Sequence, residues 1–333
     1  MTDYTYKVVH VGVHTEESLE PERLELEKVS AQQIVKPILY TEDDMLEHTR
    51  GADGMIIMES HVSRRTMEAS PNCRVVLRTG VGVDTIDIEA ATDLGIAVVN
   101  VPDVWIREVA NHALGLLLAC NRKILILDRA IRAGEWTRVI PPPVGSLHGE
   151  TLGIVGLGQI GRALATRASA FEMNLIAYDP YVNESVFNEY GVKSVSFEEL
   201  LERSDYVSAH TPLTDETRHM FNEWALNSMK QTAYLINTAR GPVVDTDALI
   251  SAIDKGCIAG AGLDVFEQEP IPEDSPLSKS DKIVLTSHSA YYSDPALHAL
   301  AIRNGQEVAR VLTGHKPLNL VNPEVLEKVK LLD

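Results

Sequence analysis

The chain has 333 residues, enough for two domains, and its 44% hydrophobic and 23% charged residues are ordinary for a globular protein. Acidic residues outnumber basic residues by 48 to 30, and the net charge of -18 argues against nucleic acid or an anionic membrane as a partner. No apolar run reaches the roughly 18 residues of a membrane-spanning helix. The N-terminus also lacks a secretory pattern, so we expect a cytoplasmic protein. Cys73, Cys120 and Cys257 have no metal-ligand spacing, so no metal site is expected.

The first hundred residues alternate short apolar runs with polar segments, which predicts a small α/β unit. The predicted strands are Lys7–Val13, Met55–Met58 and Arg74–Leu77, with a helix at Glu42–Arg50. One long helical run follows from Val104 to Ile131, and Pro141-Pro142-Pro143 then predicts a loop.

A second series of apolar runs follows the proline-rich loop, and helical segments separate its members. The runs are Thr151–Val155, Asn174–Tyr178, Tyr206–Ala209, Ala233–Asn237, Ile258–Leu263 and Ile283–Thr286. The helices include Ile160–Ala170 and Asp245–Ala252, and a last helix is predicted at Ala296–Leu312. Six such runs predict a doubly wound parallel sheet.

A glycine-rich loop lies between the first strand and the first helix of that series. Gly156 suits a tight turn, Gly158 lets a pyrophosphate approach the backbone, and Gly161 lets the helix pack closely on the strand. Asp179 ends the next strand, where a carboxylate can bind the ribose hydroxyls of a dinucleotide and repel a 2′-phosphate. The alternative for Asp179 is an ordinary turn before Pro180. Together the features favour a dinucleotide site.

Three polar residues follow later strands of the same series. Arg240, Glu269 and His288 are expected at the carboxyl ends of the strands, where ligands of open α/β sheets bind. An arginine can hold a carboxylate and polarise a carbonyl, a histidine can pass a proton, and a carboxylate can orient that histidine. Taken singly, each has a simpler explanation: a surface charge, a solvated turn and a capping histidine.

Several motifs in this order resemble the D-isomer-specific 2-hydroxyacid dehydrogenase family over essentially the whole chain. The segments that carry the resemblance are Arg78–Asp84, Gly156–Gly161, His210–Leu213, Asn237–Gly241, Gly262–Val265 and His288–Ala290. The runs Asn100–Asp103 and His288–Ser293 are most similar to the branch that contains the C-terminal-binding proteins.

The resemblance implies a Rossmann-type doubly wound domain inserted into a smaller flavodoxin-like substrate domain. We predict that residues 1–102 and 295–333 form the substrate domain and that residues 103–294 form the NAD-binding domain. It further implies an oxidoreductase that moves a hydride between NAD(H) and a D-2-hydroxyacid/2-oxoacid pair. We also expect a homodimer that uses the apolar helix Val109–Leu127 in its contact.

The resemblance assigns roles to the residues that match the family's motifs. Arg240, Glu269 and His288 correspond to its catalytic set, with His288 as general acid and base. The Val81 and Gly82 amides, with Arg240 and His288, would bind the substrate. The residues expected around the cofactor are Gly156, Gly158, Gln159, Ile160, Gly161, Asp179, Thr211, Pro212, Thr217, Thr238, Ala239, Asp264 and His288.

Two positions depart from the branch's pattern. Tyr291 stands where the branch usually has tryptophan, and the bulky pair Trp105-Ile106 stands where smaller or polar residues are expected. Trp105 also suits simple core or interface packing. The substrates of the branch therefore cannot be transferred, and phosphoglycerate, glyoxylate/hydroxypyruvate and bulkier 2-oxoacids all stay open. A second hypothesis is an NAD(H)-sensing corepressor or scaffold, which a turnover assay would distinguish from an enzyme.

Overall fold

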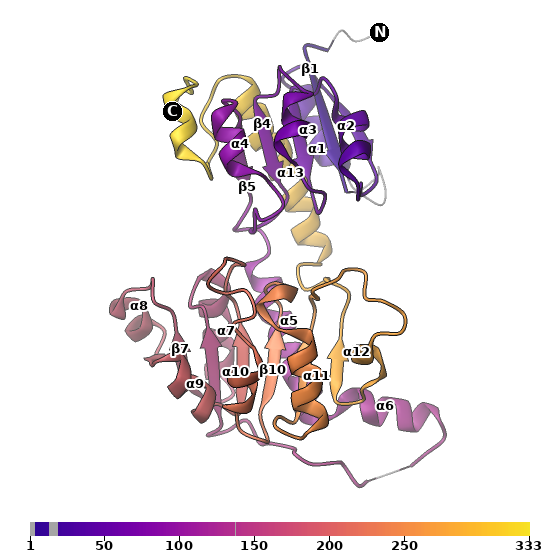
Figure 1. The fold of residues 1–333 in the computed structure, drawn as a ribbon. Helices are drawn as coiled ribbons and strands as arrows, with labels where there is room; N and C mark the ends of the chain where they lie inside the picture. Colours follow the sequence, from indigo (N-terminus) through magenta and orange to yellow (C-terminus); the bar gives the residue numbers. More distant parts are fainter. Residues whose placement is uncertain (1–3, 13–18, 137) are drawn as a thin grey trace. The chain divides into compact units, whose positions relative to one another are not determined.

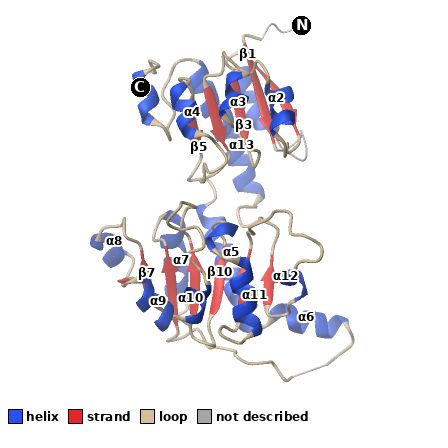
Figure 2. Ribbon diagram, viewed as in Figure 1, coloured by secondary structure: helices blue, strands red, loops and turns tan. Residues whose placement is uncertain are grey.

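The computed structural model describes residues 4–12, 19–136 and 138–333. The chain divides into two compact units, one formed by Met1–Val104 with Ser293–Asp333 and the other by Trp105–Tyr292. Each unit contains one parallel sheet with helices against it (Figure 2). No helix in these described ranges is long and apolar enough to cross a membrane.

The first unit contains a five-stranded parallel sheet in the order β2-β1-β3-β4-β5, the flavodoxin-like order. Its strands are β1 (Tyr6–Val11), β2 (Ala31–Lys36), β3 (Gly54–Ile57), β4 (Val75–Arg78) and β5 (Ala97–Asn100). Val13, the predicted end of the first strand, lies outside the described residues. The helices are α1 (Glu20–Glu27), α2 (Glu42–Thr49), α3 (Arg64–Glu68), α4 (Ile88–Asp93), α13 (Asp294–Leu312) and the 3₁₀ turn η3 (Pro323–Glu327). The C-terminal helix α13 packs against α1, so both ends of the chain build this unit (Figure 1).

The second unit contains a seven-stranded parallel sheet in the order β12-β11-β10-β9-β6-β7-β8. Its strands are β6 (Thr151–Val155), β7 (Asn174–Tyr178), β8 (Lys193–Ser194), β9 (Tyr206–Ala209), β10 (Tyr234–Asn237), β11 (Gly260–Leu263) and β12 (Ile283–Leu285). Its helices are α5 (Ile106–Arg122), α6 (Ile124–Arg132), α7 (Gln159–Ser169), α8 (Glu184–Glu189), α9 (Phe197–Arg203), α10 (Glu223–Asn227), η2 (Gly241–Val243), α11 (Thr246–Asp254) and α12 (Pro276–Lys279). β6 pairs with β7 and β9, so the strand order reverses beside β6. This is the doubly wound arrangement that the sequence predicts.

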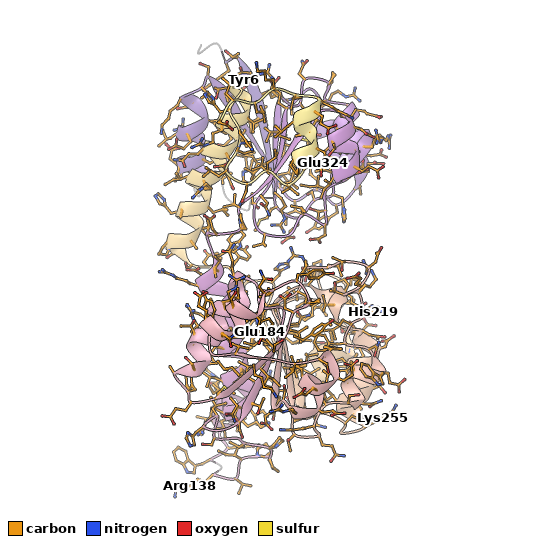
Figure 3. All side chains as sticks on the ribbon, turned by 90° about the vertical axis from the view of Figure 1, so that its left-hand side faces the viewer. Tyr6, Arg138, Glu184, His219, Lys255 and Glu324 are labelled. Carbon is orange, nitrogen blue, oxygen red and sulfur yellow. The ribbon has the colours of Figure 1, made fainter. Side chains whose placement is uncertain are left out.

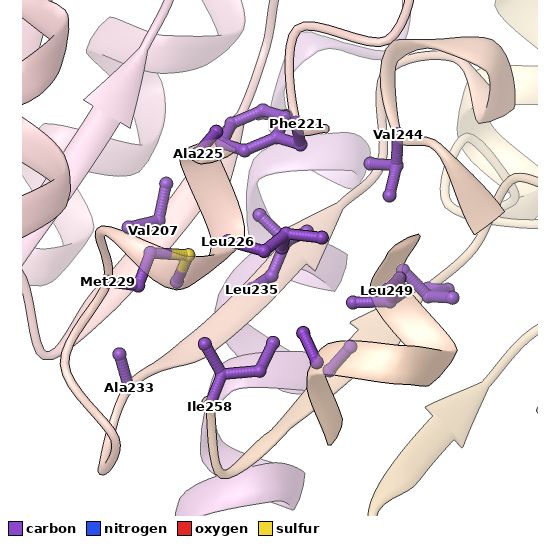
Figure 4. Packing of buried hydrophobic residues seen from close by; sticks show 14 of the residues in the cluster. Val207, Phe221, Ala225, Leu226, Met229, Ala233, Leu235, Val244, Leu249 and Ile258 are labelled. Atoms are coloured by element: carbon purple, nitrogen blue, oxygen red, sulfur yellow. The ribbon is translucent and has the colours of Figure 1, made fainter. Parts of the chain in front are cut away.

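Successive side chains of the buried strands in the second unit point to opposite faces of the sheet, so each face has its own hydrophobic core. Val155 belongs to the core that α9, α10 and α11 cover, and its neighbour Ile154 belongs to the core beneath α5 and α7. Figure 4 shows part of the first core, where Leu226 of α10 packs near Leu235 of β10. Both faces are covered by helices, as parallel sheets require.

The predicted helical run from Val104 to Ile131 is wrong as a single helix. It breaks at Lys123, which has a left-handed φ of 55° and ends α5 before α6 begins. The Lys123 ammonium lies 4.7 Å from the centre of the Tyr234 ring and donates a hydrogen bond to the Tyr234 hydroxyl. No glycine or proline marks this break in the sequence, because a tertiary contact holds it.

The two helices also differ in burial, which bears on the predicted dimer contact. In α5, Val109 and Leu117 are buried within their own unit, whereas Leu114 and Leu118 are partly buried. In α6 no residue is buried, and Ile124, Leu125 and Ile131 are all exposed. The most exposed apolar side chains of this region are therefore on α6, and the predicted dimer contact at Val109–Leu127 stays a prediction.

Candidate active site

The predicted site residues of the second unit share one edge of its sheet. Each follows a strand, and because all the strands run parallel, their carboxyl ends meet at that edge. Asp179 follows β7, Thr211 follows β9, Arg240 follows β10, and His288 follows β12. The topology thus gathers groups that are as much as a hundred residues apart in sequence.

The glycine loop between β6 and α7 has the tight geometry that its sequence predicts. Gly156 has a φ of 94°, and a Cβ atom there would lie 2.8 Å from the carbonyl oxygen of His210. A Cβ on Gly161 would lie 2.2 Å from the Gly156 carbonyl oxygen, so only glycine lets α7 come this close. Gly158 is different: it caps α7, and a Cβ there meets nothing within 4 Å. Gln159 and Ile160 begin the helix, whose free N–H groups suit a pyrophosphate.

Asp179 ties the glycine loop to the neighbouring strand. Its Oδ2 accepts a hydrogen bond of 2.8 Å from the Leu157 N–H, and its Oδ1 accepts one of 2.9 Å from the Tyr181 N–H. The carboxylate is thus fixed beside the loop, as a ribose-binding acid needs to be.

Two threonine hydroxyls at this edge are buried and have no hydrogen-bond partner within the described ranges. They are Thr211 Oγ1, which follows β9, and Thr238 Oγ1, which follows β10. Buried hydroxyls are normally satisfied, so both are suited to a polar ligand. With the open Gly158 and the fixed Asp179 carboxylate, they make a set of polar groups that fits a dinucleotide. Thr217 is used within the chain, because its hydroxyl donates to the Pro212 carbonyl at 2.7 Å.

Asn237, the last residue of β10, holds the loop that carries Arg240 through two hydrogen bonds. Asn237 Nδ2 donates to the Arg240 carbonyl at 2.9 Å, and Asn237 Oδ1 accepts from the Ala239 N–H at 3.0 Å. A Cβ on Gly241 would lie 1.9 Å from the Phe266 carbonyl, so this loop also packs closely against the one after β11. The half-buried guanidinium of Arg240 donates to the Ala239 carbonyl at 2.9 Å.

His288 and Glu269 form the pair that the sequence predicts. His288 Nδ1 lies 2.7 Å from Glu269 Oε2, and the two side chains are 28% and 31% exposed. The other oxygen, Glu269 Oε1, accepts from the Phe266 N–H at 2.8 Å. Since the carboxylate accepts, Nδ1 carries the proton, and Nε2 has no partner within the described ranges.

Asp264 has a role that sequence reasoning missed. Its side chain is fully buried, and it accepts hydrogen bonds from the Thr286 hydroxyl at 2.5 Å and from the Ser289 and Ala290 N–H groups at 3.0 and 2.9 Å. It therefore holds the turn in which His288 lies. We predicted Asp264 as a cofactor contact, and that assignment stays a prediction.

A second histidine–glutamate pair, His219 and Glu267, stabilises the start of a helix. His219, labelled in Figure 3, has Nε2 2.6 Å from Glu267 Oε1. The other Glu267 oxygen accepts from the Thr246 N–H at 2.8 Å, which caps the first turn of α11. The His219–Glu267 pair therefore stabilises the start of α11, and His288–Glu269 stays the pair predicted for proton transfer.

The two departures from the branch's pattern contact each other. The Trp105 and Tyr291 rings lie 5.1 Å apart between centres, at 55°, and Trp105 is 6% exposed. Tyr291 follows His288 by three residues, so the aromatic pair braces the end of its turn. Trp105 and Tyr291, the residues that depart from the branch's pattern, therefore form a single packing contact.

Val81 and Gly82 lie in the first unit, in the loop after β4. The preceding Gly80 has a φ of 136°, and the Asn100 side chain donates to the Val81 carbonyl at 2.7 Å. Neither the Val81 nor the Gly82 N–H donates to any residue in the described ranges. Both amides are thus available to an anion, but their joining with Arg240 stays a prediction.

Comparison with known proteins agrees with these features. A family model described as D-isomer specific 2-hydroxyacid dehydrogenase, NAD binding domain, matches residues 114–290. A glyoxylate reductase of Korarchaeum cryptofilum is 42% identical over 287 residues, which are 85% of this chain and 86% of that protein. The crystal structure of the TT0316 protein from Thermus thermophilus is 34% identical, with a TM-score of 0.86 over 95% of this chain and 99% of that one. D-lactate dehydrogenase with NAD⁺ from Lactobacillus jensenii is 26% identical, with a TM-score of 0.76 over 94% and 99%. The chain belongs to the D-isomer-specific 2-hydroxyacid dehydrogenase family and is an NAD-dependent enzyme of that family.

Proposed function

We propose that the chain reduces a small 2-oxoacid to the 2-hydroxyacid, with His288 as the proton donor and Arg240 as the residue that binds the substrate carboxylate. The observation that carries this proposal is the 2.7 Å contact between His288 Nδ1 and Glu269 Oε2, which leaves Nε2 open. A hydroxyl forms from a carbonyl group only if a proton reaches its oxygen. His288 Nε2 is the group proposed to deliver it.

Glu269 orients the ring of His288 through the contact between Oε2 and Nδ1. The Phe266 N–H fixes the second carboxylate oxygen, so the carboxylate cannot rotate away from the imidazole. A neutral glutamine at position 269 keeps the shape but loses the charge. It should therefore slow reduction while leaving some activity.

Arg240 supplies the cation that an anionic substrate needs in a protein with a net charge of -18. A guanidinium pairs with a carboxylate through two parallel hydrogen bonds and can stabilise charge that grows on the adjacent carbonyl oxygen. Lysine lacks this planar fork, so Arg240→Lys should raise KM and lower kcat together. The Val81 and Gly82 amides are proposed to bind the same carboxylate.

The cofactor would be held by the glycine loop, by Asp179 and by the unpartnered threonine hydroxyls at positions 211 and 238. When bound, NAD(H) supplies or accepts the hydride. Everything else in the reaction falls to the chain: binding the acid, orienting it and moving the proton.

A small substrate such as glyoxylate or hydroxypyruvate is the best-supported choice. The glyoxylate reductase named above covers most of the chain at 42% identity. None of the relatives named above is a C-terminal-binding protein or a corepressor. The placement in that branch stays a prediction.

The proposal is tested by NADH oxidation with glyoxylate, hydroxypyruvate and pyruvate, each compared with its amide. If Arg240 binds the carboxylate, each amide should be reduced at least ~100-fold less efficiently, because the charged pair between guanidinium and carboxylate cannot form. Similar efficiencies for acid and amide would mean that the carboxylate is not recognised. No turnover with any 2-oxoacid would exclude the proposed reaction.

We also propose a homodimer in which α6 contributes the contact, since its exposed Ile124 and Ile131 form an apolar surface. A cytoplasmic location stays a prediction from the sequence.

A further inference from the structure

His112, a residue that no motif singled out, lies behind the turn that carries His288. It belongs to α5 and is 25% exposed. Its Nε2 atom lies 2.8 Å from Thr286 Oγ1 and 3.4 Å from Asp264 Oδ1. Together with the Trp105–Tyr291 ring contact, it links the N-terminal half of α5 and its cap to the residues on either side of His288.

The direction of each hydrogen bond follows from the chemistry of the three groups. The buried Asp264 carboxylate can only accept, so the single hydroxyl proton of Thr286 goes to Asp264 Oδ1 at 2.5 Å. The Thr286 oxygen must then accept from His112, and Nε2 of His112 carries a proton. The order is His112 to Thr286 to Asp264.

This chain of hydrogen bonds ends at the backbone of the catalytic turn. Asp264 accepts from the Ser289 and Ala290 N–H groups, and its own carbonyl accepts from the His288 N–H at 2.7 Å. His288 has a φ of 51°, a left-handed conformation that is uncommon in residues other than glycine, although histidine adopts it more often than most. Such a conformation persists only where its surroundings impose it, and here Asp264 imposes it through three backbone hydrogen bonds.

We propose that His112 is a positioning residue for His288, acting through Thr286 and Asp264. The Nε2–H group of His112 donates to the Thr286 oxygen and so directs the Thr286 hydroxyl hydrogen toward Asp264. It also lies 3.4 Å from the buried Asp264 carboxylate, which water does not reach. Loss of that donor would let Asp264 turn and the His288 turn relax, which displaces the proposed proton donor. The inference rests on the proposed function only for its effect on turnover.

The test compares His112→Leu, which removes the donor, with His112→Gln, whose amide N–H can replace it. The leucine variant should lose kcat for 2-oxoacid reduction on the order of 10–100-fold, with KM for NADH changed by less than about threefold. The glutamine variant should recover most of that loss. His148→Leu, at a 75% exposed position whose side chain contacts Glu172, is the matched control and should behave as the wild type.

A second measurement tests the same contact without turnover. In His112→Leu and Thr286→Val, the Ser289 and Ala290 amide hydrogens should exchange faster with solvent, and in His112→Gln they should stay protected. In the double variant His112→Leu/Thr286→Val, these amides should exchange no faster than in either single variant, because both substitutions break the same series of hydrogen bonds.

Unchanged exchange and unchanged kcat in His112→Leu would overturn the inference. So would a loss that glutamine fails to restore, since that would make His112 a packing residue only. If His288→Ala is as active as the wild type, the proposed function fails instead, and the exchange experiment still decides whether His112 holds the turn.

Discussion

Alanine substitutions at two glycines of one loop should have opposite consequences, because the glycines meet different surroundings. A Cβ on Gly161 would lie 2.2 Å from the Gly156 carbonyl oxygen and 3.2 Å from Ile154 Cγ2. A Cβ on Gly158 meets nothing within 4 Å, and the φ of Gly158 is an ordinary -70°. We therefore expect Gly161→Ala to disturb the folded chain itself, and Gly158→Ala to leave it intact but to fill the space that we propose for the pyrophosphate.

The magnitudes follow from these distances. In Gly161→Ala, the new methyl group must move about 1 Å away from the Gly156 carbonyl to reach an ordinary contact distance. The backbone of Gly156 cannot easily move aside, because its N–H donates to the Tyr178 carbonyl at 2.9 Å. The overpacking should therefore lower the free energy of unfolding by about 1–3 kcal/mol. For Gly158→Ala, the free energy of unfolding should change by less than ~0.5 kcal/mol. Its Kd for NADH should rise at least ~10-fold, which corresponds to about 1.4 kcal/mol.

Urea unfolding and NADH fluorescence titration measure the two quantities separately. Gly115→Ala is the control, since Gly115 lies in α5 with nothing within 4 Å of its Cβ, and it should gain ~0.5–1 kcal/mol without affecting NADH binding. The reasoning is refuted if Gly158→Ala binds NADH as tightly as the wild type, or if Gly161→Ala is as stable as the wild type.

Three further expectations follow from the structure. NADH should be preferred over NADPH by ~30–150-fold in kcat/KM because Asp179 opposes a 2′-phosphate, and equal efficiencies would mean that Asp179 does not face the ribose. Burial lowers the pKa of His210 to about 4. Since the unfolded chain binds this proton near pH 6.5, the free energy of unfolding should fall as the pH drops from about 6.5 to about 4, by at most ~1.4 kcal/mol per pH unit. His210→Asn should flatten that slope in urea titrations, and an unchanged slope would assign it to other groups. Light scattering should give twice the 36.6-kDa chain mass for the wild type and a lower mass for Ile131→Asp, whereas a monomeric wild type would exclude the α6 contact.

Periodicity predicted the second unit well because its central strands are apolar and buried on both faces. The predicted runs at Thr151–Val155, Asn174–Tyr178 and Tyr206–Ala209 coincide with β6, β7 and β9. It missed β2 (Ala31–Lys36), whose sequence AQQIVK is polar because the strand lies at the edge of its sheet. It also missed the two-residue edge strand β8, which is too short to show a pattern.

Sequence reasoning also found residues of the candidate site whose chemistry is visible in their type. His288 and Glu269 could be paired from the need to orient a histidine, and the structure places them 2.7 Å apart. His112 could not be found in this way, because its partners Asp264 and Thr286 lie more than 150 residues away. Only the packing of α5 on β11 and β12 brings them together, and no spacing in the sequence encodes it.

The most direct test of the proposed chemistry is the rate of a single turnover of NADH and glyoxylate in the wild type and in His288→Ala. Removing a general acid should lower that rate by ~10²–10⁴-fold when NADH and glyoxylate are both saturating. A rate in His288→Ala equal to that of the wild type would show that the proton comes from elsewhere.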